Sequence, residues 1–460
     1  MISSVSGITS LNHGIPIKNA SSNACSQQKT FHGLLPKTFG LKPANILTQL
    51  NSNDKKKYAY LVDYLKDFPV SYNSSNTPAK KQLDILLKNG RLLSKSKNDR
   101  STTLDNLYDI ATKEREYGLD SKRLLGDTLD ILSNPRIITQ TFGDIPDIEK
   151  QKILSELPDN ENVKNNPSLM DVTASGTCAA ASNEVNLADK YPAEFARWVS
   201  KLSAKNDPLY LNINLSSISK NKLDAVTILN LLDAKTESFS FDKVRIKINA
   251  DKNVGIRAGI QNKYWDPGER NVADVLVQSA IMQLGSQNTY DTLTDIRGGN
   301  FNSNLQGLIE IEKTFVESLI KDKEITSLVY QKFDDSQNLI GYTCSFDKME
   351  KHIKDTIDSG DDVIIGYVLT NETSGRTASQ YYNPQTDGAP NKVINGHEIT
   401  IVDYKTDENG KTTFICIDTD DDSNGFVEYT ADWLLPKLHH AGYPAHIVEA
   451  DEKEILKNCS

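Results

Sequence analysis

The chain lacks the features that define several large classes of protein. Its 460 residues include five cysteines, an odd number at scattered positions, and no Cys-x-x-Cys pair. This pattern excludes a disulfide framework and offers no ligand spacing for a structural zinc site. No apolar stretch approaches 18 residues, and the N-terminus has no basic segment followed by an apolar core. We therefore expect neither a membrane-spanning helix nor a standard secretion signal.

The chain also has fewer basic than acidic residues. The net charge is −10 and the sequence pI is about 5.3. An acidic chain of this kind argues against nucleic acid or an anionic membrane surface as a general partner. Cytoplasmic residence is the default expectation, and export by a route without a standard signal is the alternative.

The sequence contains enough apolar residues for a packed core, since 38% of its residues are hydrophobic. Residues 1–51 are rich in Ser, Asn, Lys and Gly and predict a flexible tail. Residues 52–160 carry apolar residues at three- and four-residue spacing, most clearly in 104–119 and 121–132, and predict an α-helical region. The polar segment 157–167 predicts a domain boundary. The helical region suits either an inhibitory pro-segment or a domain that binds a substrate or partner.

A second unit is predicted over residues 165–450, with helices early and strands late. The alternating segments 397–404 and 411–418 flank Asp-Glu-Asn-Gly, which strongly indicates a β-hairpin. Pro436 in the last helical segment predicts a kink or an early stop. The fold class expected from this order is α+β.

Cys178 is a candidate nucleophile. It follows Ser-Gly-Thr and precedes Ala-Ala-Ala-Ser, so it falls in the first turn of a predicted helix. A thiol reacts as the thiolate, which the positive end of a helix and a neighbouring imidazolium both stabilise. The competing interpretation is a buried structural cysteine in an alanine-rich helix.

Two further residues complete a candidate catalytic group. His397 begins the first strand of the predicted hairpin, where a rigidly held ring suits a general base. Asp418 ends the second strand, and regular antiparallel pairing brings that end back beside the start of the first. Asp418 would then hold and charge-stabilise the imidazole, as the acid of a catalytic triad does.

The chain order Cys, His, Asp resembles the papain-like cysteine peptidase superfamily over roughly residues 165–435. The segment MEKHIKDTIDSGDDVIIGYVL (349–369) is similar to the helix, glycine and strand that precede the catalytic histidine there. NGHEITIVDY (395–404) is similar to the histidine strand, and TFICID (413–418) to the strand that delivers the third residue. Residues 273–301 are loosely similar to the calpain-like branch; a bacterial papain-fold branch is the other possibility.

The resemblance implies a papain-like catalytic domain, with the Cys on an N-terminal helix and the His and Asp on a C-terminal antiparallel sheet. It also implies a hydrolase that cleaves peptide bonds of a protein or peptide substrate through a thioester acyl-enzyme. Two alternatives stay open. One is a papain-fold binding module without catalysis, and the other is a deamidase or transglutaminase-like acyl-transfer enzyme.

The chain departs from the family pattern at two places. The family usually has a Gln six residues before the nucleophile, donating to the oxyanion, and Val172 occupies that position here. Thr173 and Ser175 are the candidate replacements for this donor. The family's Asn-Ser-Trp segment is also missing, and ICIDTDDD (415–422) stands in its place.

The acidic run after residue 417 has a rival interpretation as a calcium loop. Asp420, Asp422 and Asn424 continue an alternation that starts at Asp418, as the first ligands of such a loop do. The sixth and twelfth positions hold Ser and Tyr rather than Gly and Glu, so a full EF-hand loop is excluded. A looser calcium site or a solvated acidic turn remains, and no other metal or cofactor is expected.

Overall fold

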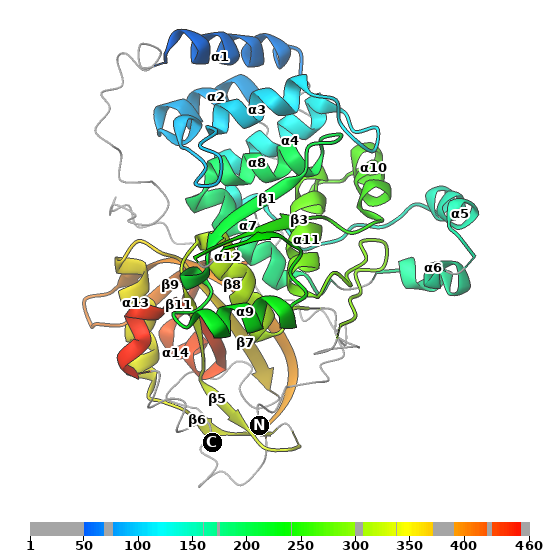
Figure 1. Cartoon of the computed structure of the whole chain (residues 1–460). Helices are drawn as coiled ribbons and strands as arrows, with labels where there is room; N and C mark the ends of the chain where they lie inside the picture. The colour runs from blue at the N-terminus through cyan, green and yellow to red at the C-terminus, as the bar shows by residue number, and fades with distance from the viewer. Residues whose placement is uncertain are drawn as a thin grey trace.

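The computed structural model describes residues 50–68, 77–159, 161–172, 175–240, 242–299, 307–336, 338–370, 391–420 and 426–451. These residues form helices and antiparallel sheets, so the predicted α+β class is confirmed (Figure 1). None of the helices in these ranges is long and apolar enough to cross a bilayer. The predicted tail, residues 1–51, lies almost entirely outside the described residues.

At three of the N-terminal helices, a side chain accepts hydrogen bonds from the free backbone N–H groups of the first turn. Thr102 and Asp105 form a capping box at one of them, and the Asp120 carboxylate caps another. The predicted helix over 104–119 ends early, at Thr112, where the backbone of Lys113 becomes extended. The helices of this region are α1 (Ser52–Tyr64), α2 (Ala79–Lys88), α3 (Thr103–Thr112), α4 (Ser121–Ser133), α5 (Asp147–Glu156) and α6 (Asn162–Asn165).

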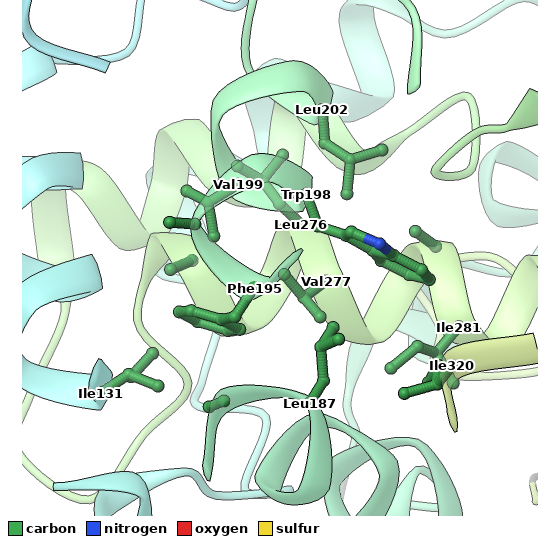
Figure 2. Packing of buried hydrophobic residues seen from close by; sticks show 14 of the residues in the cluster. Ile131, Leu187, Phe195, Trp198, Val199, Leu202, Leu276, Val277, Ile281 and Ile320 are labelled. Carbon is green, nitrogen blue, oxygen red and sulfur yellow. The ribbon is translucent and has the colours of Figure 1, made fainter. Parts of the chain in front are cut away.

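The first four of these helices share a hydrophobic core with α7 (Cys178–Lys190), α8 (Pro192–Leu202) and α11 (Val272–Gly285). Figure 2 shows Phe195 and Trp198 of α8 facing Leu187 of α7 and Leu276 of α11. Phe195, Trp198 and Leu187 are at most 1% exposed. The helix that begins with Cys178 is therefore held by apolar packing along its length, and its first residue has a defined position. The predicted boundary near 157–167 stays a prediction.

The larger sheet has the strand order β10-β9-β8-β7-β11-β4, with β5 and β6 attached through β8. Each pairing along this path is antiparallel. The predicted hairpin is present: Thr406 pairs with Thr412, and Gly410 supplies the positive φ of the turn. The strands are β4 (Ile325–Val329), β5 (Gln331–Phe333), β6 (Asn338–Tyr342), β7 (Val363–Thr370), β8 (Asn391–Thr406), β9 (Thr412–Ile417), β10 (Val427–Thr430) and β11 (Leu438–Pro444).

A smaller sheet has the order β1-β3-β2, and the remaining helices surround the two sheets. Pro436 does stop the last predicted helix early, since its α-helical part ends at Leu434. These elements are β1 (Leu209–Asn214), β2 (Thr236–Phe239), β3 (Lys243–Ile248), α9 (Lys222–Leu231), α10 (Val254–Tyr264), α12 (Glu310–Lys321), α13 (Phe346–Asp358) and α14 (Ala431–Leu434).

Strand β8 is covered differently on its two faces. Ile399 and Ile401 belong to a core that includes Met349 of α13 and Leu434 of α14. The opposite face of β8 lies against helices. There the Thr400 hydroxyl lies 3.4 Å from a backbone carbonyl of α7, and the Glu398 carboxylate accepts a hydrogen bond from Lys313 of α12. Because successive residues of a strand point to opposite faces, His397 and Glu398 enter two separate environments.

Candidate active site

Cys178 is the first residue of α7 and carries a free, half-buried thiol. The residue before it, Thr177, has non-helical backbone angles, so the helix starts at the cysteine itself. Ala179, Ala180 and Ala181 follow and are at most 1% exposed, which lets the first turn pack closely into the core. The sequence-based placement of this cysteine at a helix start is thus observed.

The structure brings His397 and Asp418 together. In the β8–β9 hairpin Thr400 lies opposite Ile417, so Asp418, the next residue, comes close to His397. His397 lies within β8 and not at its start as predicted, because the strand begins at Asn391. His397 Nε2 lies 2.6 Å from Asp418 Oδ1, and the two side chains are 13% and 9% exposed. The acid predicted to orient the imidazole therefore does contact it.

The electrostatics of the pair favour a charged ring. Burial of the imidazole opposes its protonation, but the Asp418 carboxylate and the Cys178 thiol outweigh this effect, so the pKa of His397 is raised well above its usual value. Burial also acts to raise the pKa of Asp418, yet the contact with His397 lowers it below the usual value. His397 thus contacts the predicted acid directly, and the predicted thiol is near enough to raise the pKa of its ring.

Aromatic side chains surround this pair. The Tyr367 ring meets the imidazole edge-on, with centroids 5.7 Å apart, and Trp433 packs on Tyr367 at 6.1 Å. Tyr429 stacks on Trp433, and its hydroxyl donates to Asp418 Oδ2 at 3.3 Å. Rings that exclude water lower the local dielectric and strengthen the hydrogen bond between acid and imidazole.

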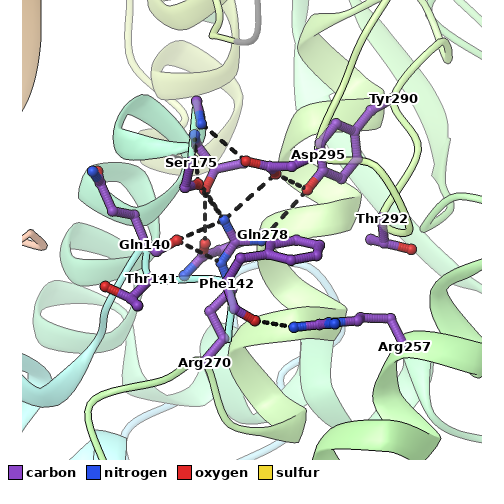
Figure 3. Close-up of polar contacts among 12 residues, drawn as sticks. Gln140, Thr141, Phe142, Ser175, Arg257, Arg270, Gln278, Tyr290, Thr292 and Asp295 are labelled. Carbon is purple, nitrogen blue, oxygen red and sulfur yellow. Dashed lines mark hydrogen bonds and ion pairs between the residues drawn. The ribbon is translucent and has the colours of Figure 1, made fainter. Parts of the chain in front are cut away.

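The turn before the thiol is held by buried charges (Figure 3). The backbone N–H of Gly176 donates to Asp295 Oδ2 at 2.9 Å, and Tyr290 donates to Oδ1 of the same carboxylate at 2.5 Å. Arg270 lies 3.6 Å from Asp295 and donates to Ser175 Oγ at 2.6 Å. Arg270 and Asp295 are at most 1% exposed. A buried ion pair with its hydrogen bonds satisfied fixes this turn in one conformation.

The Arg270 guanidinium also links the turn before Cys178 to the segment that contacts the residue after Asp418. Arg270 donates to the backbone carbonyl of Gln140 at 2.8 Å and to the Thr177 hydroxyl, directly before Cys178. The backbone N–H of Gln140 in turn donates to the carbonyl of Thr419, directly after Asp418, at 2.9 Å. The segment that follows α4 therefore bridges the two halves of the site.

Of the predicted oxyanion donors, only Ser175 lies within the described residues, and Thr173 does not. The Ser175 hydroxyl shares a 2.9 Å hydrogen bond with Thr177 and accepts from Arg270. It is thus part of the network that supports the turn. Its role as an oxyanion donor stays a prediction.

The candidate calcium residues are described only in part. Asp422 and Asn424 lie outside the described residues, whereas Asp420 lies inside them. The backbone N–H of Asp420 donates to Asp418 Oδ1 at 3.1 Å. That bond places Asp420 in the turn that supports the acid.

Sequence reasoning missed the supporting residues Arg270, Asp295 and Tyr290. They lie about a hundred residues after the cysteine, and no spacing relates them to it. A lone Arg or Asp gives no local signal, since only the tertiary fold brings the two together.

Comparison with known proteins assigns no relative. No protein-family model matches the chain, and no curated protein matches its sequence significantly. The chemistry of the site is therefore argued from its own geometry.

Proposed function

We propose that the chain is a cysteine peptidase of papain-like type, with Cys178 as nucleophile, His397 as proton carrier and Asp418 as the acid that orients the ring. One observation carries this proposal: the His397 imidazole contacts the Asp418 carboxylate, and the Cys178 thiol is near enough to act with it in raising the pKa of the ring. A histidine with a purely structural place in a strand has no reason to contact a carboxylate at the end of the neighbouring strand.

The geometry supports a separate role for each of the three residues. Because Nε2 of His397 is engaged by Asp418, Nδ1 is the nitrogen left to take the proton of the Cys178 thiol. The thiolate sulfur then attacks the carbonyl carbon of an amide and forms a tetrahedral oxyanion. As the C–N bond breaks, the imidazolium returns its proton to the leaving amine, which leaves a thioester on Cys178. Water, deprotonated by the same ring, hydrolyses the thioester and releases the acid product.

The thiol also lies where a thiolate is stabilised. It stands at the N-terminal end of a 13-residue helix, where backbone N–H groups point outward, and the His397 imidazolium lies beside it. The same N–H groups supply an oxyanion donor at the nucleophile itself, as in other thiol and serine enzymes. Val172, at the position of the family's Gln, leaves the second donor to the turn held by Arg270 and Asp295.

The resemblance noted in the sequence adds support from topology. A helix begins with the cysteine, and an antiparallel hairpin carries the histidine and the acid, as the papain-like superfamily would require. A deamidase or transglutaminase-like enzyme uses the same acyl-enzyme and differs only in the acceptor of the acyl group. Product analysis separates them, since a peptidase exposes a new amino terminus and a deamidase releases ammonia.

The test is covalent labelling of the full chain by an epoxide-type thiol probe, read by intact mass and peptide mapping. We expect one label, on Cys178, and none in the Cys178→Ala variant. Cys344→Ala is the matched control, because Cys344 is also a half-buried cysteine with a thiol. Labelling confined to Cys344 or Cys416, or no labelling at any pH, would contradict the proposal.

A further inference from the structure

A second cluster of chemically active side chains lies on the other face of the large sheet. His439 and His440 are consecutive on β11, and Glu310 is the first residue of α12. Within the described part of the chain, these three residues form a group whose ligand atoms all lie within 4.8 Å of one another. The mechanism proposed above uses none of them.

The three ligand atoms have the spacing of a metal site. His439 Nδ1 lies 2.8 Å from His440 Nδ1 and 3.4 Å from Glu310 Oε1, and His440 Nδ1 lies 3.7 Å from that oxygen. In a tetrahedral zinc site with bonds of about 2.0–2.1 Å, neighbouring ligand atoms are about 3.3 Å apart. One ion can therefore reach all three atoms at normal bond lengths.

A β-bulge explains how two consecutive histidines share one side of a strand. Neighbouring side chains normally point to opposite faces, but the β11–β7 register shifts between Leu438 and His440. The extra residue turns the His439 ring toward its neighbour. The two histidines are each 7% exposed, so both rings are held in a buried setting.

The second ring nitrogen of His440 meets a carboxylate. His440 Nε2 lies 2.7 Å from Glu398 Oε1, and Lys313 donates to the other oxygen of Glu398 at 3.2 Å. Metal-ligating histidines commonly direct their other nitrogen to a carboxylate in this way, which orients the ring and raises its basicity as a ligand. This arrangement is independent of the three ligand atoms and points to the same conclusion.

Gly366 makes the contact between His440 and Glu398 possible. It lies between them on β7, paired with Glu398 on one side and His440 on the other. A Cβ at this position would lie 2.6 Å from His440 Nε2 and 2.8 Å from Glu398 Oε1, closer than real Cβ atoms approach. Glycine therefore keeps open the space that the two side chains fill.

The charges suit a divalent cation. Burial acts to raise the pKa of Glu398, but Lys313 and His440 outweigh it and lower that pKa to about 2, so the residue is anionic. A neutral imidazole has the lone pair that metal binding requires. Two carboxyl side chains, Glu310 and Glu398, and one lysine, Lys313, lie at the cluster.

We propose that Glu310, His439 and His440 bind one Zn²⁺ ion, with Glu398 orienting His440 and a water molecule or a fourth donor completing the tetrahedron. Two imidazole nitrogens and one carboxylate oxygen are a ligand set that zinc accepts. The half-buried Glu310 leaves the fourth position accessible. The ion would tie the start of α12 to the start of β11, and this proposal does not depend on the peptidase mechanism.

The test measures Zn²⁺ binding to the full chain in a Cys178→Ala background, so that the thiol–imidazole pair supplies no ligand. After metal removal by a chelator, titration calorimetry with Zn²⁺ should give one ion per chain. His439→Ala and Glu310→Gln should each weaken binding by at least about 10–100-fold. His446→Ala is the control, because His446 is exposed and should bind Zn²⁺ no differently from the background.

Two further readouts separate lost binding from lost folding. Zn²⁺ should raise the thermal midpoint of the background protein but not that of the His439→Ala variant. Glu398→Gln retains all three ligands and should weaken Zn²⁺ binding about 10–100-fold. Absence of Zn²⁺ binding in the background, or equal binding in background and His439→Ala protein, would overturn the proposal.

Discussion

Two histidine–carboxylate pairs lie back to back across strand β8 and can be compared directly. His397 meets Asp418 at 2.6 Å on one face, and Glu398, the next residue, meets His440 at 2.7 Å on the other. The two pairs have similar histidine–carboxylate distances, and their side chains are buried to a similar extent. They differ in the third group, which is the Cys178 thiol for one and the His439 imidazole with the Glu310 carboxylate for the other.

The third group decides what each pair can do. Beside a thiol, a ring whose pKa is raised can hold a proton and return it, which suits acid–base chemistry. Beside a second imidazole and a carboxylate, three ligand atoms lie within 4.8 Å of one another, which suits a cation. A histidine–carboxylate pair is therefore not specific to one function.

The largest effect should come from removing the proton carrier. His397→Ala should slow epoxide labelling of Cys178 by about 10²–10⁴-fold, the usual contribution of a general acid or base. The measurement is the second-order rate of inactivation at neutral pH. His440→Ala is the matched comparison, and an equal loss in that variant would show that the two pairs are not independent.

The acid of the catalytic pair should set the pH range of reactivity. Asp418 raises the pKa of His397, so Asp418→Asn should lower that pKa, by about 1–3 units for a removed opposite charge. Epoxide opening consumes a proton from the imidazolium, so the alkaline limb of the inactivation profile should move to lower pH by the same amount.

Stability provides the control for this variant. Because the folded pKa of His397 is raised, its stabilising contribution is fully present below about pH 6.5 and is lost as pH rises through the folded pKa. Asp418→Asn should flatten that pH dependence of the free energy of unfolding. An unmoved alkaline limb would remove Asp418 from the triad.

The smallest effect should come from filling the space at Gly366. Gly366→Ala should destabilise the fold by about 1–3 kcal/mol, because the methyl group displaces the His440 ring. It should also weaken Zn²⁺ binding by a larger factor than it slows labelling of Cys178. Chemical denaturation, calorimetry and labelling on the same sample test both statements, and a larger loss of labelling would contradict the separation of the two sites.

The helix start at Cys178 and the pairing of His397 with Asp418 were predictable because local rules place them. Ser-Gly-Thr before an alanine run indicated the helix start at Cys178, and Asp-Glu-Asn-Gly indicated the turn that brings Asp418 back to His397. A tight hairpin has one favoured register, so residues near its two open ends become neighbours without knowledge of the rest of the chain.

The metal-binding group was not predictable by the same means. His439 and His440 are adjacent, a spacing that matches no zinc motif, and they converge only because of a β-bulge. Glu310 lies well over a hundred residues earlier, and nothing in the sequence places it beside these histidines.

Short-range chemistry in the sequence was thus sufficient for the α+β class, the helix that starts at Cys178 and the pairing of His397 with Asp418. Tertiary structure decided what supports the thiol turn, through the buried Arg270 and Asp295, and what Glu398 meets on the opposite face of the sheet. The physical reason is the distance along the chain over which each kind of interaction acts. Caps, turns and strand alternation act over a few residues, whereas buried charges select partners by position in the folded core, where each unpaired charge costs several kcal/mol.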